Sequence, residues 1–185
     1  MPNSAGGGEG KGFGPFSISQ GNDWAARLGI PADVGTAAVF SDDPGGFKRR
    51  LLAGRSQIVL WKSRPMYGHF FALVPRKGGR EVEVYDSQAA GGEETLRDYL
   101  DGRRGDKRNG PPGWLGRVVS EMAAAHNVRL TYNQRAPQGR DSETCLLHTL
   151  ARAAAPDVPA AQFTKKANRF FVKYAAEEAQ PRTRR

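Results

Sequence analysis

The sequence contains very little cysteine: Cys145 is the single one among 185 residues. One cysteine excludes an intrachain disulfide, and with it the disulfide-stapled class of small secreted domains. Long apolar runs are absent too, since no stretch approaches the roughly 20 residues that a membrane-spanning helix requires. Residues 1–12 have no apolar segment of the kind found in signal peptides. We therefore expect a protein of a reducing compartment without a membrane partner.

Acidic residues are in the minority, because 19 Asp and Glu stand against 28 Lys and Arg, a formal net charge of +9. This positive field attracts polyanions such as nucleic acid, an anionic membrane surface or an acidic protein. A soluble surface that is rich in arginine but binds no polyanion would give the same net charge. We expect one α+β domain over residues 13–178, preceded by a flexible Gly-rich arm (1–12) and followed by a basic tail (179–185).

Hydrophobic periodicity and turn residues predict the elements of this domain. The predicted strands are 36–40, 56–62, 67–76, 80–87 and 129–133, and the predicted helices are 22–30, 42–54, 91–102, 114–128, 142–155 and 158–178. Asn22 or Asp23 would cap the first helix. Residues 80–87 alternate charged and apolar side chains, which predicts a half-exposed strand. Gly78-Gly79 predicts a hairpin turn before it, which places His69 on one strand and Asp86 at the end of the other.

The one thiol lies at the start of a predicted helix that Ser142 would cap. The free N–H groups and the macrodipole of a helix N-terminus favour a thiolate over a thiol. A lone cysteine is nevertheless most often a small buried hydrophobic residue. Cys145 by itself therefore leaves both a nucleophile and a packed side chain open.

A nucleophilic cysteine requires a base, and the chain has three histidines. His148 follows Cys145 by three residues on the same helix, and His126 lies at a helix end, so structural roles are favoured for both. His69 is flanked by apolar residues in a core strand, where an imidazole needs a polar partner. Asp86 can accept a hydrogen bond from one ring nitrogen and leave the other facing a thiol. An ordinary buried His–Asp pair would produce the same pattern.

Gln138 lies seven residues before Cys145, on the loop that enters the helix. Its amide can donate into the space above the sulfur and form an oxyanion hole with the backbone N–H of Cys145. It can also be an ordinary loop glutamine. Taken in order, His69, Asp86, Gln138 and Cys145 favour a cysteine nucleophile more than any one of them does alone.

This order resembles that of the adenain-like cysteine proteases, the group of the adenovirus maturation protease, and of the wider Ulp/SUMO-protease group. "QGRDSETC" is similar to the adenain-like pattern Gln-Gly-x-x-Ser-x-x-Cys, and "GFGPF" is similar to its Gly-x-Gly-Pro-aromatic start. The separation of 17 residues from His69 to Asp86 matches as well. The likeness extends over about residues 12–175.

The sequence departs from that pattern at three positions. Leu146 follows the thiol where the family usually has Gly, and Phe70 follows the histidine where it usually has Trp. Asp86 stands where the adenain branch has Glu. The Ulp branch has Asp at this position, as this chain does. Leu146 would either narrow the site or mark an inactive enzyme.

The resemblance implies an α+β fold with a central mixed sheet flanked by helices and the Cys145 helix against the sheet. It implies a cysteine endopeptidase without a metal or other cofactor, in which His69 is the base, Asp86 orients it, and Gln138 with the Cys145 N–H binds the oxyanion. The implied substrates are capsid or core precursor proteins, cleaved after small residues during virion maturation, in the virion or in the host nucleus or cytoplasm. DNA or a peptide would be the activator, and the peptide would bind non-covalently because the chain has no second cysteine.

The resemblance also gives the positive charge a role, which is non-sequence-specific contact with packaged DNA. The candidate contacts are Lys48, Arg49, Arg50, Arg103, Arg104, Lys107, Arg108, Lys165 and Lys166, with the tail 182–185. Two further hypotheses remain open. One is a SUMO- or ubiquitin-like deconjugating protease of the same chemistry. The other is an inactive, nucleic-acid-binding virion protein that keeps the protease fold, which Leu146 would favour.

Overall fold

The computed structural model describes residues 16–64, 67–88, 107–133, 144–159 and 162–163. Its strands are β1 (Ala32–Thr36), β2 (Ser56–Arg64), β3 (Tyr67–Arg76), β4 (Glu81–Asp86) and β5 (Arg129–Tyr132). Its helices are α1 (Ile18–Arg27), α2 (Ala37–Asp42), α3 (Pro44–Leu52), α5 (Trp114–His126) and α6 (Cys145–Ala154), with 3₁₀ turns at Lys77–Gly79 and Lys107–Asn109. The predicted arm, tail and helix 91–102, and most of the predicted helix 158–178, lie outside the described residues.

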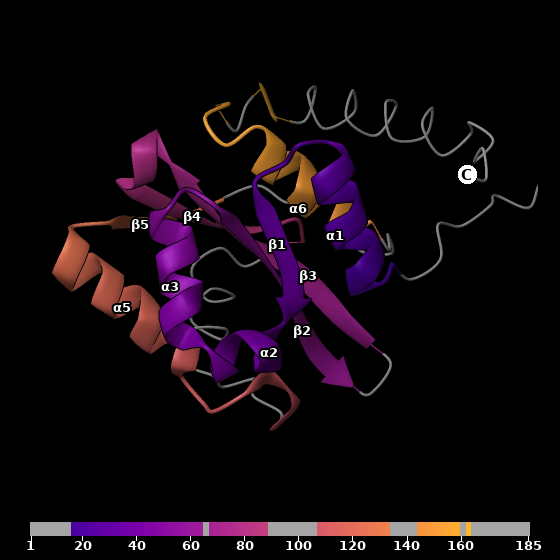
Figure 1. Cartoon of the computed structure of the whole chain (residues 1–185), viewed down its shortest axis with the longest axis horizontal. Coiled ribbons are helices and arrows are strands. Elements are labelled where there is room, and N and C mark those ends of the chain that lie inside the picture. The colour runs from indigo at the N-terminus through magenta and orange to yellow at the C-terminus, as the bar shows by residue number, and fades with distance from the viewer. Residues whose placement is uncertain (1–15, 65–66, 89–106, 134–143, 160–161, 164–185) are drawn as a thin grey trace, which may run out of the picture.

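The five strands form one mixed sheet in the order β1-β2-β3-β4-β5 (Figure 1). The outer pairs, β1–β2 and β4–β5, are parallel, while β2–β3 and β3–β4 are antiparallel. The turn between β3 and β4 contains Gly78 and Gly79 at φ of 65° and 82°, a backbone conformation that favours glycine. The predicted hairpin is therefore confirmed, and so is the α+β class with a mixed sheet flanked by helices.

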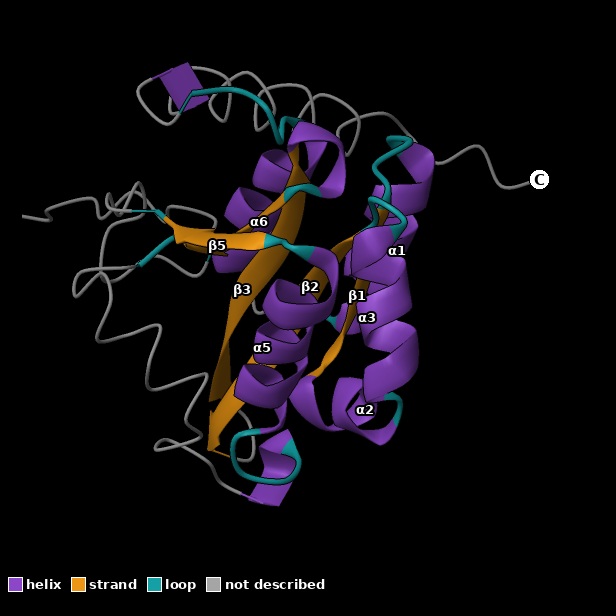
Figure 2. Cartoon of the chain, turned by 90° about the vertical axis from the view of Figure 1, so that its left-hand side faces the viewer, coloured by secondary structure: helices purple, strands orange, loops and turns teal. Residues whose placement is uncertain are grey.

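Helices cover both faces of the sheet, and each face has its own hydrophobic core. Along β3, Phe70, Ala72 and Val74 pack with α1 and α6. The intervening Phe71 and Leu73 pack with α2, α3 and α5. In Figure 2, α5 lies in front of the sheet and α6 behind it. The alternation of side chains along a strand thus places α6, which begins with Cys145, beside α1 on one face of the sheet, opposite the face covered by α2, α3 and α5.

The prediction that the fourth strand would be half-exposed is wrong, because all six residues of β4 are buried. Its charged positions are neutralised by partners from other elements. Glu83 accepts hydrogen bonds from Arg152 of α6 at 2.7 and 2.5 Å. Glu81 pairs with Arg76 at 3.2 Å and also with Arg129. A period-two pattern of charges therefore marks two ion-paired interior positions here, not a solvent face.

Two boundaries near the N-terminus differ from prediction. The predicted strand 36–40 is wrong, because Thr36 ends β1 and caps α2 by accepting a hydrogen bond from the N–H of Val39 at 3.2 Å. The predicted cap at Asn22 or Asp23 is also wrong, because the N-cap is Ser17, which forms a capping box with Gln20. At Thr36 the capping hydrogen bond favours a helix over the predicted strand, and at Ser17 the capping box sets an earlier helix start.

The other described elements agree with prediction to within a few residues. Strands 56–62, 67–76 and 129–133 and helices 42–54, 114–128 and 142–155 are present as β2, β3, β5, α3, α5 and α6. None of the helices in the described ranges combines the length and apolar character that crossing a membrane takes.

Candidate active site

His69 and Asp86 meet on the β3–β4 hairpin. The register pairs Phe71 with Asp86, and side chains two residues apart on a strand share a side of the sheet. Asp86 therefore lies on the same side as His69. His69 Nε2 is 2.6 Å from Asp86 Oδ1, and the two side chains are 20% and 8% exposed. The contact predicted from the hairpin is present.

Cys145 is the first residue of α6, so its sulfur lies at the helix N-terminus as predicted. Thr144 is the N-cap, and the predicted cap Ser142 lies outside the described residues. α6 packs against β3, β2 and β4. Cys145 is partly buried and hydrogen-bonds His69. The structure thus brings together the thiol and the imidazole from elements 76 positions apart in the sequence.

The end of β4 makes this meeting possible. β4 stops at Asp86, opposite Phe71, so residues 67–70 of β3 continue beyond it. On that stretch β2 pairs with one edge of β3, and no strand within the described ranges pairs with the other. His69 therefore lies at an open edge of the sheet. The first turn of α6 reaches it there.

The charge state of His69 follows from these contacts. Burial alone would lower its pKa, but the hydrogen bonds to Asp86 and Cys145 and the charges of both partners raise the pKa to about 9. The imidazole is therefore protonated near neutral pH. With Nε2 occupied by Asp86, Nδ1 is the ring nitrogen that remains for the sulfur. An imidazolium in this position stabilises negative charge on Cys145.

This pKa predicts how stability depends on pH. The folded value of about 9 lies above the ordinary value near 6.5, so His69 stabilises the fold fully below about pH 6.5 and loses that contribution as pH rises through 9. We expect the difference in Tm between wild type and His69→Gln to be largest near pH 6 and to shrink towards pH 10. Thermal denaturation across this range measures it, with His126→Gln as the imidazole-removal control. A difference that grows with pH would contradict the assigned protonation.

The other two histidines lie on helices. His148 is 8% exposed on α6, and burial lowers its pKa to about 4, so it is neutral. His126 is the last residue of α5, at the helix end where the sequence placed it. Among the residues that the structure describes, no three His, Cys, Asp or Glu side chains gather in a way that would hold a metal ion.

Leu146 does not point into the site. It is 0% exposed and belongs to the core between α6, α1 and β3. Gly21 of α1 faces it: a Cβ at Gly21 would lie 3.3 Å from Leu146 Cδ1 and 3.1 Å from both Val34 methyl carbons. The missing side chain of Gly21 therefore provides the room that Leu146 occupies. Leu146 is a packing residue and does not narrow the space around the sulfur.

The candidate phosphate contacts are only partly described. Lys48 and Arg50 of α3 are engaged with acidic residues, since Lys48 pairs with Glu121 at 2.9 Å and Arg50 lies 3.6 Å from Asp43. Arg49 and Arg108 are exposed. Lys107 begins a 3₁₀ turn. Arg103, Arg104, Lys165 and Lys166 lie outside the described residues, as does Gln138.

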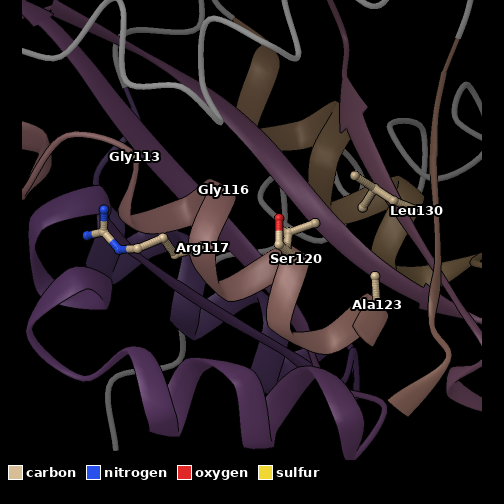
Figure 3. A pocket seen from close by; sticks show the side chains of 7 residues that line it. Gly113, Gly116, Arg117, Ser120, Ala123 and Leu130 are labelled. Atoms are coloured by element: carbon tan, nitrogen blue, oxygen red, sulfur yellow. The ribbon is translucent and has the colours of Figure 1, made fainter. Parts of the chain in front are cut away.

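A separate hollow of about 580 Å³ lies along α5 beside β5 (Figure 3). It is lined by Gly113, Gly116, Arg117, Val119, Ser120, Ala123 and Leu130. This lining contains no thiol, imidazole or carboxylate. Ser120 contributes a hydroxyl to the hollow, but no residue of the lining can serve as the base that would activate it. The candidate chemistry therefore remains at Cys145.

Sequence reasoning missed one residue of the site. Asn133, directly after β5, hydrogen-bonds the backbone of Asp86 through its side chain. The signal in the sequence was weak, because an asparagine after a strand usually marks a turn.

A comparison of the chain with protein-family models and with curated protein sequences finds no match. Inferences about function therefore depend on the site geometry and on the motif resemblance.

Proposed function

We propose that this protein is a cysteine endopeptidase with an adenain-like fold. The observation that carries the proposal is the contact chain Asp86–His69–Cys145, with 2.6 Å between Asp86 Oδ1 and His69 Nε2 and a hydrogen bond from His69 to Cys145. A thiol at a helix N-terminus, paired with an imidazole that a carboxylate orients, is the arrangement that activates sulfur for attack on a carbonyl.

The proposed reaction proceeds in two stages. The Cys145 thiolate attacks the peptide carbonyl carbon, and the His69 imidazolium donates its proton to the departing amine, which leaves a thioester. His69 then takes a proton from water as the water attacks the thioester, and the acid product and the thiolate are released. Asp86 keeps Nε2 directed toward itself throughout. The backbone N–H of Cys145, which has no acceptor within its own helix because it lies in the first turn, and the Gln138 amide would hold the oxyanion.

Capsid or core precursor proteins are the substrates that the motif resemblance favours, with DNA or a non-covalent peptide as activator in the virion. The net charge of +9 is compatible with DNA contact. A deconjugating protease of the Ulp type is the second candidate, favoured by Asp86 as the acid. The burial of Leu146 in the core supports an active site over the inactive alternative, because this side chain is directed away from the thiol.

The test is covalent labelling with a peptide chloromethyl ketone that ends in glycine, with and without DNA, on wild type, Cys145→Ser and His69→Ala. We expect labelling of Cys145 in wild type, none in Cys145→Ser, and a rate in His69→Ala lower on the order of a hundredfold. His126→Gln is the control and should label like wild type. Equal rates in wild type and His69→Ala would contradict the proposal. Preferential labelling by a ubiquitin-like protein with an electrophilic C-terminus would favour the second candidate.

A further inference from the structure

We propose that Asn133 is a positioning residue of this site, which holds the backbone of Asp86 so that its carboxylate meets His69. The consequence for Cys145 rests on the proposed function. The consequence for His69 follows from the geometry and does not depend on it.

The side chain of Asn133 acts as an extra peptide group of the sheet. β5 pairs with β4 as far as Tyr132 opposite Val84, and the N–H of Asn133 then donates to the Val84 carbonyl at 3.3 Å. One step further, the side-chain Oδ1 of Asn133 accepts from the N–H of Asp86 at 2.8 Å, and Nδ2 donates to the carbonyl of Asp86 at 2.7 Å. The parallel ladder is thus extended by one residue after β5 has ended.

A carboxamide suits this position because it carries a donor and an acceptor side by side. Asn133 is 7% exposed, and both hydrogen bonds are buried. Removing the amide would leave the N–H and the carbonyl of Asp86 without these partners in a dry environment, which backbone groups rarely tolerate. The backbone of Asp86 would then shift to find other partners.

Such a shift bears directly on the catalytic pair. Asp86 is the last residue of β4, so the ladder beyond it does not fix its orientation. Its Oδ1 accepts from His69 Nε2 at 2.6 Å and from the N–H of Gln88 at 2.8 Å. Because the hydrogen bond to His69 is short, a small displacement of the Asp86 backbone weakens it and releases the ring. Asn133 therefore acts on His69 through Asp86.

The experiment compares wild type with Asn133→Ala and Asn133→Ser by two readouts. The first is the NMR titration of the His69 ring, and the second is the rate of iodoacetamide reaction with Cys145 against pH. We expect the His69 midpoint to fall from about 9 towards the ordinary 6.5. The alkylation rate near pH 6 should fall by about tenfold or more. The serine variant keeps a hydroxyl at the position, so it tests the inference if the alanine variant does not fold.

Asn22→Ala is the matched control. Asn22 makes the same two hydrogen bonds to the backbone of Val34, at 2.8 and 2.9 Å, on the other edge of the sheet. This variant should lower Tm and leave both pH profiles as in wild type. If the Asn133 variants also show only a lower Tm and keep both pH profiles of wild type, Asn133 merely stabilises the fold and the inference is overturned.

The two proposals fail separately. If Cys145 of wild type reacts slowly and independently of His69, the protease function fails, and the His69 titration still decides the role of Asn133. If wild-type reactivity depends on His69 but the Asn133 variants match wild type in both readouts, only the role of Asn133 fails.

Discussion

Asp86→Asn is expected to lower the reaction rate of Cys145 with iodoacetamide near pH 6 on the order of a hundredfold. The carboxylate supports the imidazolium by a 2.6 Å hydrogen bond and by its charge, and both raise the pKa of His69. A carboxamide has no charge to offer. It can also present its NH₂ to Nε2, which would favour the wrong tautomer. Without the imidazolium, the sulfur loses the cation that stabilises its negative charge.

The measurement is the pH–rate profile of alkylation, with the NMR titration of His69 alongside. Asp23→Asn makes the same chemical change on the exposed side of α1, where the side chain is 60% exposed. It should behave like wild type. A profile in Asp86→Asn that coincides with wild type would mean that Asp86 does not support His69, and the assigned roles in the site would have to be redrawn.

Arg152→Met is expected to reduce the free energy of unfolding by about 3–5 kcal/mol, the usual result of removing one partner of a buried ion pair. The Arg152 and Glu83 side chains are 2% and 5% exposed. Arg152 binds Glu83 through Nε and Nη2, and its Nη1 donates to the carbonyls of Ala155 and Val158 at 3.2 and 2.9 Å. Among the residues that the structure describes, the variant would leave Glu83 with the more distant Arg76, at 3.7 Å, as its ion-pair partner.

Urea denaturation of the single and double variants measures this effect. Because the cost comes from a buried charge left behind, Glu83→Gln combined with Arg152→Met should be more stable than Arg152→Met alone. Arg55→Met is the matched control, since its ion pair with Asp33 is 46% and 31% exposed, and its loss should cost less than about 1 kcal/mol. If Arg152→Met lowers the free energy of unfolding no more than Arg55→Met does, the buried charge of Glu83 does not depend on Arg152 for its stabilisation.

The hairpin with His69 and Asp86, and the helix that begins at Cys145, could be predicted from the sequence. These features depend on signals carried by neighbouring residues: the apolar strand, the Gly78-Gly79 turn and the apolar face of the helix. The beginning of α1 was placed too late in the sequence, and the residues that form α2 were predicted as part of a strand. Several polar residues there can cap, and only the folded backbone selects Ser17 and Thr36.

Only the tertiary structure decided which distant segments complete the site. The charges at Glu81 and Glu83 look solvent-exposed in a linear pattern, and their burial depends on arginines from β3, β5 and α6. Asn133 and Asp86 are 47 positions apart, so their contact required the parallel pairing of β4 with β5. The place of Leu146 in the core depends on Gly21 of α1, which lies opposite it and has no side chain to occupy that space. The sequence alone determined the local periodicity, turns and order of chemical groups, because these are properties of adjacent residues. The burial of charge and the choice of partners depend on which surfaces meet, and folding alone determines that.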